Sequence, residues 1–316
     1  MDPANRILEL LYDADRPIWV AELAGRIAGD VPAVDGALAR LAGRGHRLER
    51  GPEGVRLVRP VALDAHLIER DLPVARIGRH VICFGEVDST SDVAFGSAAQ
   101  APGEALVVTA EFQRGGRGRL GRRWICPRGA GVLASVLLPG TAEDWAPDGL
   151  TLAAGVAVAE GVEAAAGVAT DLAWPNDVVI DGAKLAGVLV EVRDGRVVVG
   201  VGINVVAAPA PDEIGRSAVC LAGAAGRAVE RIDVLRAVLA ALDARAADLA
   251  DGRADAVHDA WVRRCRMINR RVRVASADGD VAGRVVDVSP AEGLVLLTDA
   301  GRRLHLPAAT STLLPG

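Results

Sequence analysis

Two Asp-Gly pairs near the middle of the chain, at residues 181–182 and 194–195, constrain the fold more than any other feature. They separate three apolar runs, at residues 178–180, 185–192 and 197–201. Asp-Gly readily adopts the positive φ angles of a two-residue hairpin turn, so the runs are predicted to be strands of an antiparallel meander. We therefore expect an antiparallel sheet at the centre of the protein.

The first of these turns also predicts a register. A two-residue loop pairs Val179 with Lys184 and, two positions on, Asp177 with Ala186. Because side chains alternate between the faces of a strand, Asp177 and Lys184 should project from one face as diagonal neighbours, about 7 to 8 Å apart at Cα. They would form either an anion- and metal-binding surface or a structural ion pair.

Lysine occurs once in this sequence. Of the 36 lysines and arginines, Lys184 is the single lysine, which leaves 35 arginines. Arginine thus serves wherever a generic cation suffices. A requirement for a compact ammonium, which a planar guanidinium cannot replace, is the economical explanation for Lys184.

Residues 113–124, read as QRGGRGRLGRRW, alternate glycine with arginine. Glycine permits close approach of the backbone to a ligand, and arginine offers planar donors suited to phosphate and carboxylate. We expect a loop that closes over a phosphate-bearing ligand, with a solvated basic loop as the alternative. Arg117 and Arg119 lie inside the glycine spacing and are site candidates. The arginines assigned to the solvated part are Arg114, Arg122 and Arg123.

Two shorter motifs accompany the meander. Residues 174–177 read Trp-Pro-Asn-Asp, and proline should hold Asn176 and Asp177 in a defined pose. Asparagine can pair with a purine edge, and aspartate can hold Mg²⁺. In residues 200–204, glycines permit close backbone approach before Asn204. Each motif is weak alone.

Residues 4–59 predict three helices and a hairpin, the order of a winged helix-turn-helix, which lays its third helix in the DNA major groove. The third helix, after Asp30, opens with poor donors to base edges, and Asp35 would face the phosphates. Both DNA binding and a structural or regulatory appendage therefore stay open. The expected apolar helix positions are Ile7, Leu8, Leu10 and Leu11, then Trp19, Leu23 and Ile27, then Val34, Leu38 and Leu41.

The remaining patterns complete an α+β protein with three domains, at residues 1–60, 61–266 and 267–316. Helices at 150–166 and 232–260 should pack on the central, mainly antiparallel sheet. In the tail, short apolar runs joined by turns predict a small β-barrel. The expected additional strands are 81–84, 106–110 and 131–138 in the centre, and 271–274, 281–288, 294–297 and 303–306 in the tail.

Composition limits the functional classes. A net charge of −5 argues against a protein that lives mainly on nucleic acid, so DNA contact must be local. Four dispersed cysteines predict neither a zinc site nor disulfides. The apolar segment 151–170 contains Glu160 and Glu163, so we interpret it as a buried helix of a cytoplasmic protein and not as a membrane span.

Together the motifs resemble those of biotin protein ligases, and the whole chain resembles the bifunctional biotin ligase/biotin operon repressor type. The matching motifs are Asp88-Ser89-Thr90, residues 113–124, residues 174–177, Lys184 to Glu191, and Gly202-Ile203-Asn204. The resemblance implies a class II synthetase-like catalytic domain and an SH3-like C-terminal barrel. It also implies a homodimer and a role in transcription regulation.

The resemblance implies a two-step reaction without an enzyme nucleophile. Biotin and MgATP form biotinyl-5′-adenylate and pyrophosphate. A lysine of a biotin carboxyl carrier domain, in acetyl-CoA carboxylase or a related carboxylase, then takes the biotin. No Ser/His/Asp or Cys/His arrangement stands out in the sequence, which agrees with this scheme.

The resemblance also assigns site residues. Lys184 and Arg119 would be catalytic, and Asp177 would lie near Mg²⁺. Biotin would be bound by Ser89, Thr90, Ser91, Gln113, Gly116, Arg117, Gly118, Arg119 and Lys184. ATP and the adenylate would be bound by Arg119, Trp124, Asn176, Lys184 and Asn204.

Two positions depart from the family pattern, and two rival functions stay open. Ala173 stands where the family usually has lysine, and Ser91 stands where it usually has asparagine. One rival is a lipoyl or octanoyl ligase, in which the Gly-Arg-Gly-Arg run is not expected. The other is a DNA-binding repressor that senses biotin or its adenylate without turnover.

Overall fold

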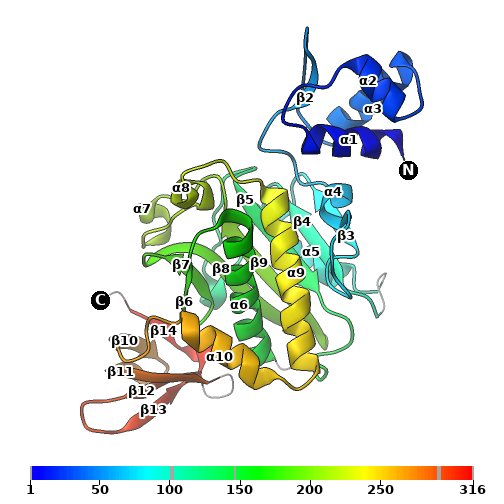
Figure 1. Ribbon diagram of the computed structural model, residues 1–316. Coiled ribbons are helices and arrows are strands. Elements are labelled where there is room, and N and C mark those ends of the chain that lie inside the picture. Colours follow the sequence, from blue (N-terminus) through cyan, green and yellow to red (C-terminus); the bar gives the residue numbers. More distant parts are fainter. Residues whose placement is uncertain (1, 100–102, 146, 290–292, 315–316) are drawn as a thin grey trace.

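The computed structural model describes residues 2–99, 103–145, 147–289 and 293–314, and it has three parts (Figure 1). The first part holds three helices followed by a two-stranded antiparallel hairpin, the predicted order. Asp2 and Asp30 begin two of the helices, since each carboxylate accepts a backbone N–H of the first turn. The elements are α1 (Pro3–Asp13), α2 (Val20–Arg26), α3 (Val31–Gly43), β1 (Leu48–Gly51) and β2 (Gly54–Leu57).

Among the expected apolar helix positions of this part, Trp19 is exposed, whereas Leu10, Ile27 and Leu38 are partly buried and the others are buried. Trp19 was expected on the inner face of the second helix with Leu23. It lies instead just before α2 and is 56% exposed, whereas Leu23 is fully buried. The prediction was wrong because the helix begins one residue later, at Val20, which takes Trp19 off the helical face.

The central part contains a seven-stranded sheet in the order β3-β4-β5-β9-β8-β7-β6. Its β3–β4 pair is parallel, and the other pairs within the described residues are antiparallel, as the sequence predicts. The strands are β3 (Val81–Phe84), β4 (Leu106–Ala110), β5 (Gly131–Leu137), β6 (Asp171–Ala173), β7 (Asp177–Ile180), β8 (Ala183–Arg193) and β9 (Arg196–Asn204).

The β7–β8 hairpin departs from the predicted register by one residue. The turn forms as expected, because Asp181 and Gly182 have φ angles of 49° and 81° and Val179 pairs with Lys184. A bulge between Val178 and Val179 then shifts the ladder, so Asp177 pairs with Gly187 and not with Ala186. The extra residue of a bulge increases local twist and re-aims the flanking side chains.

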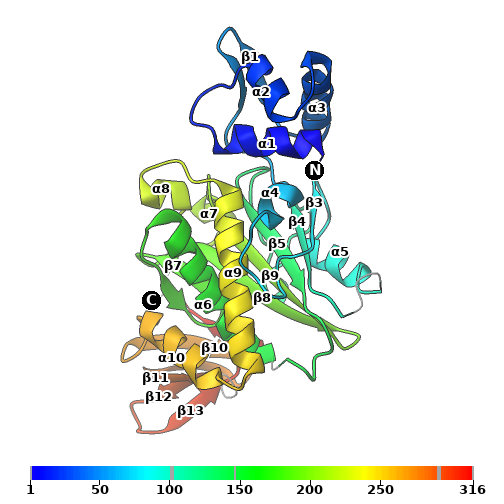
Figure 2. The same ribbon diagram turned by 45° about the vertical axis from the view of Figure 1, so that its right-hand side comes forward.

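Two long helices lie side by side on one face of the central sheet, α6 (Pro147–Ala166) and α9 (Arg231–Ala250) (Figures 1 and 2). They approach closely at Gly161, where a Cβ atom would lie 2.6 Å from the backbone of Val238. Segment Gly149–Ala166 is long and apolar enough to cross a membrane by composition, but it is 72% buried within the protein. It therefore serves as a core helix, as predicted.

Shorter helices complete the central part. The predicted helix at 232–260 is interrupted near Gly252, which has a φ angle of 75°, and α10 (Ala254–Arg264) follows. Helix α5 (Thr90–Gly96) contacts β4, β5 and β9, where Ala94 joins a small apolar cluster. Helix α4 (Ala65–Glu69) lies in the connection from the first part.

The C-terminal part is a five-stranded antiparallel sheet in the order β13-β12-β11-β10-β14. The four predicted strands are present, and the two-residue β14 was not predicted because its sequence carries no alternation long enough to read. The strands are β10 (Arg271–Ser276), β11 (Gly279–Ser289), β12 (Gly293–Leu297), β13 (Arg303–Leu306) and β14 (Thr312–Leu313).

Ionic contacts attach the first part to the centre, and Asp64 is the most buried acid among them. Its carboxylate accepts a backbone N–H at the start of α4 and also contacts Arg44 and His46, the latter at 3.1 Å. Burial works to raise the pKa of Asp64, but the hydrogen bond from His46 and the charge of Arg44 bring that pKa below its ordinary value. Ionised Asp64 is therefore favoured by the folded state.

Replacing Asp64 with asparagine should lower the free energy of unfolding by about 1 to 3 kcal/mol at pH 7, because it leaves Arg44 and buried His46 without a carboxylate. Since the folded pKa is depressed, this contribution is present above the ordinary pKa and is lost as pH falls through the folded pKa. Urea denaturation of the wild type and the variant, at pH 7 and at a pH below the folded pKa of Asp64, measures this difference in the free energy of unfolding. Asp35→Asn, which removes an exposed partner of Arg50, should cost less than about 0.5 kcal/mol. Equal losses for the two variants would contradict this assignment.

Candidate active site

A cavity of about 980 Å³ lies over one side of the central sheet and collects almost all of the predicted site residues. Its walls come from the start of α5, the Gly-Arg segment, the strands β7 to β9, the 209–216 connection and residues 312–314 of the C-terminal part. Gly116 is the one predicted residue outside the lining. The predicted residues in the lining are Ser89, Thr90, Ser91, Gln113, Arg117, Gly118, Arg119, Trp124, Asn176, Asp177, Lys184 and Asn204.

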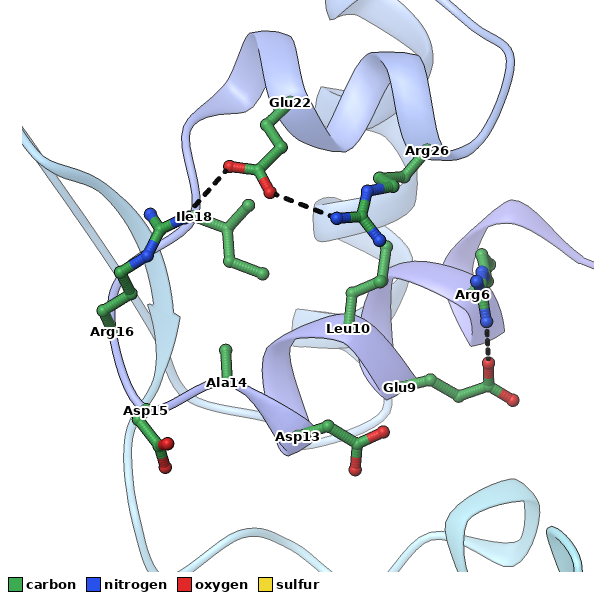
Figure 3. A pocket seen from close by; sticks show the side chains of 10 residues that line it. All are labelled: Arg6, Glu9, Leu10, Asp13, Ala14, Asp15, Arg16, Ile18, Glu22 and Arg26. Carbon is green, nitrogen blue, oxygen red and sulfur yellow. Dashed lines mark hydrogen bonds and ion pairs between the residues drawn. The ribbon is translucent and has the colours of Figure 1, made fainter.

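A smaller hollow of about 430 Å³ lies between α1 and α2 (Figure 3). Each of its arginines is paired with an acid: Glu22 lies 3.6 Å from both Arg16 and Arg26, and Arg6 pairs with Glu9 at 2.9 Å. The larger cavity, in contrast, combines unbalanced cations, buried hydroxyl groups and an aromatic ring. We therefore consider the larger cavity the candidate site.

A buried cluster of hydroxyl and amide groups forms one end of the cavity. The Thr90 backbone N–H and hydroxyl both donate to Gln113 Oε1, at 2.7 and 3.0 Å. The Ser135 hydroxyl, on β5, lies 2.7 Å from that of Thr90 and 3.0 Å from that of Ser91. Sequence reasoning missed Ser135, although a single serine inside the apolar run 131–138 was a signal. This end suits a small polar ring with both donors and acceptors.

Trp124 fits over two glycines that face each other across β8 and β9. Gly187 pairs with Gly202, and a Cβ atom on Gly202 would lie 2.3 Å from the Trp124 ring. On Gly187 the corresponding distance to the ring would be 3.2 Å. The absence of side chains at these two positions therefore lets the indole lie flat on the sheet. Lys184 Nζ lies 5.4 Å from the ring centroid, in range of a cation–π contact.

Asp177 lies between two cations. Its Oδ1 is 2.6 Å from Lys184 Nζ, and its Oδ2 is 2.6 Å from Arg216 Nη1. Asp177 is 8% exposed, so both contacts occur in a poorly solvated environment. The predicted approach of Asp177 and Lys184 is thus present, through the bulged register. Arg216 was not predicted, because its surroundings in the sequence carry no motif.

This arrangement does not fit Asp177 as a direct ligand of Mg²⁺. Both carboxylate oxygens already contact cations, and a divalent ion at either oxygen would meet the ammonium or the guanidinium. Within the described ranges, no group of three or more His, Cys, Asp or Glu side chains could hold a metal. The carboxylate is better described as the counter-ion of Lys184 and Arg216.

The arginines of the Gly-Arg segment differ in their partners. Arg117 binds Asp92 at 2.6 and 2.9 Å and Glu191 at 3.3 Å, and these contacts raise the pKa of Arg117 and lower that of Asp92. Arg119 donates instead to the Ala308 carbonyl of the C-terminal part and has no ion pair in the described chain. Burial lowers the pKa of Arg119.

The cavity is also lined by two arginines that the sequence analysis assigned to solvent. Arg122 and Arg123 are exposed but belong to the cavity wall, and neither has a carboxylate partner among the described residues. The alternation of glycine and arginine gave no means of separating them from Arg114, which pairs with Glu86 and Asp88. Their position depends on how the chain turns at Leu120, which has a φ angle of 55°.

Two asparagines present amide groups to the cavity wall. Asn204 is 1% exposed, and its Nδ2 points to the carbonyls of Lys184 and Val219 at 3.5 and 3.4 Å. Its Oδ1 has no hydrogen-bond partner among the residues that the structure describes, so a buried acceptor is available. Asn176 Nδ2 donates to the Val188 carbonyl, which ties residues 174–177 to β8.

Comparison with known proteins places the chain in a family. Residues 84–206 match the model of the biotin/lipoate A/B protein ligase family. The bifunctional ligase/repressor BirA of Bacillus subtilis is 33% identical over 258 residues, which cover 79% of each chain. The biotin–[acetyl-CoA-carboxylase] ligase of Mycobacterium tuberculosis is 34% identical over 229 residues, 70% of this chain and 83% of that protein.

Solved structures agree with these relatives. The biotin protein ligase of Aquifex aeolicus in complex with biotin and ATP superposes with a TM-score of 0.67 and 27% sequence identity. The match covers 75% of this chain and all of that one. Because the sequence identity extends over most of two curated relatives and the fold is shared, this chain belongs to the biotin protein ligases of the biotin/lipoate A/B protein ligase family.

Proposed function

We propose that the protein activates biotin with MgATP to biotinyl-5′-adenylate and transfers the biotin to a lysine of a biotin carboxyl carrier domain. Lys184 carries this proposal, since the single lysine of the chain lies in the large cavity, over the Trp124 ring and against Asp177. Relatives named as biotin ligases and a biotin- and ATP-bound structure of the same fold support it.

The polar end of the cavity is proposed to bind the ring system of biotin. The cyclic urea of biotin has two N–H donors and a carbonyl acceptor, which match the hydroxyl and amide groups of Ser89, Thr90, Ser91 and Gln113 together with Ser135. Arg117, Gly116 and Gly118 would then close the loop over the ring. In this orientation the carboxylate of biotin points along the cavity towards Lys184.

Catalysis is proposed to rest on positioning and charge neutralisation. The biotin carboxylate attacks the α-phosphorus of ATP, and pyrophosphate leaves. Lys184, assisted by Arg119, holds the two anions together and stabilises the negative charge on the oxygens of the transition state. Trp124, Asn176 and Asn204 hold the adenylate. The carrier lysine then attacks the acyl carbon, an amide bond forms, and AMP leaves. Mg²⁺ enters with the phosphates of ATP as part of the substrate.

The three parts of the chain are proposed to correspond to domains at residues 1–60, 61–266 and 267–316. The first would be a winged helix-turn-helix and the last an SH3-like barrel. A cytoplasmic location and a homodimer are proposed from the family alone.

Purified protein incubated with biotin, MgATP and a carrier domain should label the carrier, because both half-reactions are contained in one chain. Streptavidin blotting detects the product, and omission of ATP is the control. Labelling with lipoate and not with biotin would favour the lipoyl ligase. Binding of biotin without any labelling would favour a sensor without turnover.

Lys184→Arg should slow adenylate formation by about tenfold or more, because a larger, planar guanidinium must replace an ammonium that already lies 2.6 Å from Asp177 and 5.4 Å from the Trp124 ring centroid. Biotin-dependent exchange of labelled pyrophosphate into ATP measures this step. The reverse swap Arg266→Lys should leave the rate unchanged, because the Arg266 side chain, which pairs with Asp171, is 70% exposed and lies outside the cavity. Normal exchange by the Lys184 variant would show that a compact ammonium is not required there.

DNA binding by the first part is a second proposed function, supported by its three helices and hairpin and by the relatives named as ligase/repressors. Its arginines, however, pair with nearby acids: Arg50 with Asp35, Arg56 with Glu49 and Arg40 with Asp2. These pairs should weaken contact with phosphate.

Asp35→Asn should therefore tighten binding to duplex DNA several-fold at low salt, because it frees Arg50 and removes a negative charge from α3. Fluorescence anisotropy over a salt series measures the affinity. Asp280→Asn, which makes the same charge change in the C-terminal sheet, is the control. If the affinity for DNA changes with neither the substitution nor the salt concentration, the first part is a structural appendage and not a DNA-binding domain.

A further inference from the structure

Arg216 is the one ion-paired cation of the cavity that neither the sequence motifs nor the proposed reaction assigns. It follows the short helix α7 (Pro211–Ile214) and Gly215, and its side chain is 38% exposed. The residues after it are fixed to the strand that carries Lys184. Lys184 N–H donates to the Ser217 carbonyl at 2.9 Å, and Val219 N–H donates to the Lys184 carbonyl at 2.9 Å. Arg216 is therefore held at a defined position relative to Lys184.

The two cations contact opposite oxygens of Asp177. Lys184 lies on the side of Trp124, whereas Arg216 reaches Asp177 from the 209–216 connection. Arg216 thus adds a second cation on the other oxygen of the carboxylate. Ala173 pairs directly with Asp177 across β6 and β7, and its methyl group cannot supply a charge there. Arg216 therefore supplies a second cation, besides Lys184, on this stretch of the wall.

The charge of the cavity fits a polyanion. Its lining carries six cationic side chains and two carboxylates, although the whole chain has a net charge of −5. The two acids are Asp177, shared by Lys184 and Arg216, and Glu213, whose carboxylate accepts the Ala210 N–H. Asp177 alone cannot neutralise both of its cations. An excess of positive charge is therefore left at this wall, where the field attracts anions.

We propose that Arg216 binds the β- and γ-phosphates of ATP and the departing pyrophosphate, with Asp177 as the counter-ion that the phosphates replace. This proposal rests on the proposed ligase function. The planar guanidinium can donate two parallel hydrogen bonds to phosphate oxygens, whereas the compact ammonium of Lys184 suits the crowded α-phosphate beside the biotin carboxylate. Arg216 is thereby a substrate-binding residue for the first half-reaction only, since biotinyl-adenylate carries no β- or γ-phosphate.

Arg216→Ala should raise the KM for ATP and weaken inhibition by pyrophosphate, each by about tenfold to a hundredfold, the range expected for lost charge-assisted hydrogen bonds. The KM for biotin should change less than about twofold, because the groups proposed for the biotin ring lie elsewhere. Arg216→Lys should recover part of the loss. Initial rates of biotin-dependent pyrophosphate exchange, measured over ATP and biotin concentrations, give these constants.

The rate of the second half-reaction distinguishes phosphate binding from a purely structural role, because a structural defect would slow that step as well. When presynthesised biotinyl-5′-adenylate is supplied, Arg216→Ala should biotinylate the carrier domain at the wild-type rate. Equal losses in exchange and transfer would mean that Arg216 only shapes the connection that it belongs to. An unchanged KM for ATP would mean that it is merely the partner of Asp177. Either result overturns the proposal.

Two controls separate this proposal from the function on which it rests. Arg266→Ala breaks another Arg–Asp pair, 2.8 Å long and outside the cavity, and should alter neither half-reaction. Wild-type protein that failed to transfer biotin from the adenylate would refute the ligase function itself. If the wild-type protein is active and the Arg216 variant has an unchanged KM for ATP, only the role of Arg216 is refuted.

Discussion

The contact between Asp177 and Lys184 organises the candidate site, because it is a charged pair in a poorly solvated wall. A buried carboxylate is costly unless cations or hydrogen bonds compensate it, and here Lys184 and Arg216 occupy its two oxygens. Such a pair contributes little net stability, but its geometry is specific. It holds the single lysine of the chain at one point, where the bulged hairpin, the tryptophan and the 209–216 connection meet.

Close backbone packing provides the rest of the site. The glycine pair across β8 and β9 makes room for the Trp124 ring, and the ring in turn bounds the space around Lys184. At the other end, Ser135 on β5 joins the hydroxyl groups at the start of α5 to Gln113. The C-terminal part contributes through the Ala308 carbonyl, which accepts from Arg119. Residues between 89 and 216 and residues of the C-terminal part thus meet over one side of the central sheet.

A buried ion pair also fastens the connection from the N-terminal helices to this region. Arg231, which is 2% exposed, contacts Glu111 at 2.6 Å and donates to the Val61 carbonyl at 2.9 Å. Glu111 in turn accepts the Leu63 N–H at 2.7 Å and lies two residues before Gln113. The connection at residues 61–63 and the start of the Gly-Arg segment therefore share one anchor, so movement of either would disturb buried charge.

The sequence alone determined what depends on local pattern. Two Asp-Gly turns and alternating apolar runs were sufficient for the meander, helical spacing for α6, and the rarity of lysine for Lys184. The strand register of the hairpin and the full set of cavity-lining residues were decided only by the tertiary structure. The bulge between Val178 and Val179 shifted the predicted register, because alternation cannot reveal an inserted residue. Ser135, Arg122, Arg123 and Arg216 joined the cavity although no motif marked them. A cavity wall brings together residues that are remote in the chain, and their approach is governed by packing and by charge compensation, neither of which a linear pattern contains.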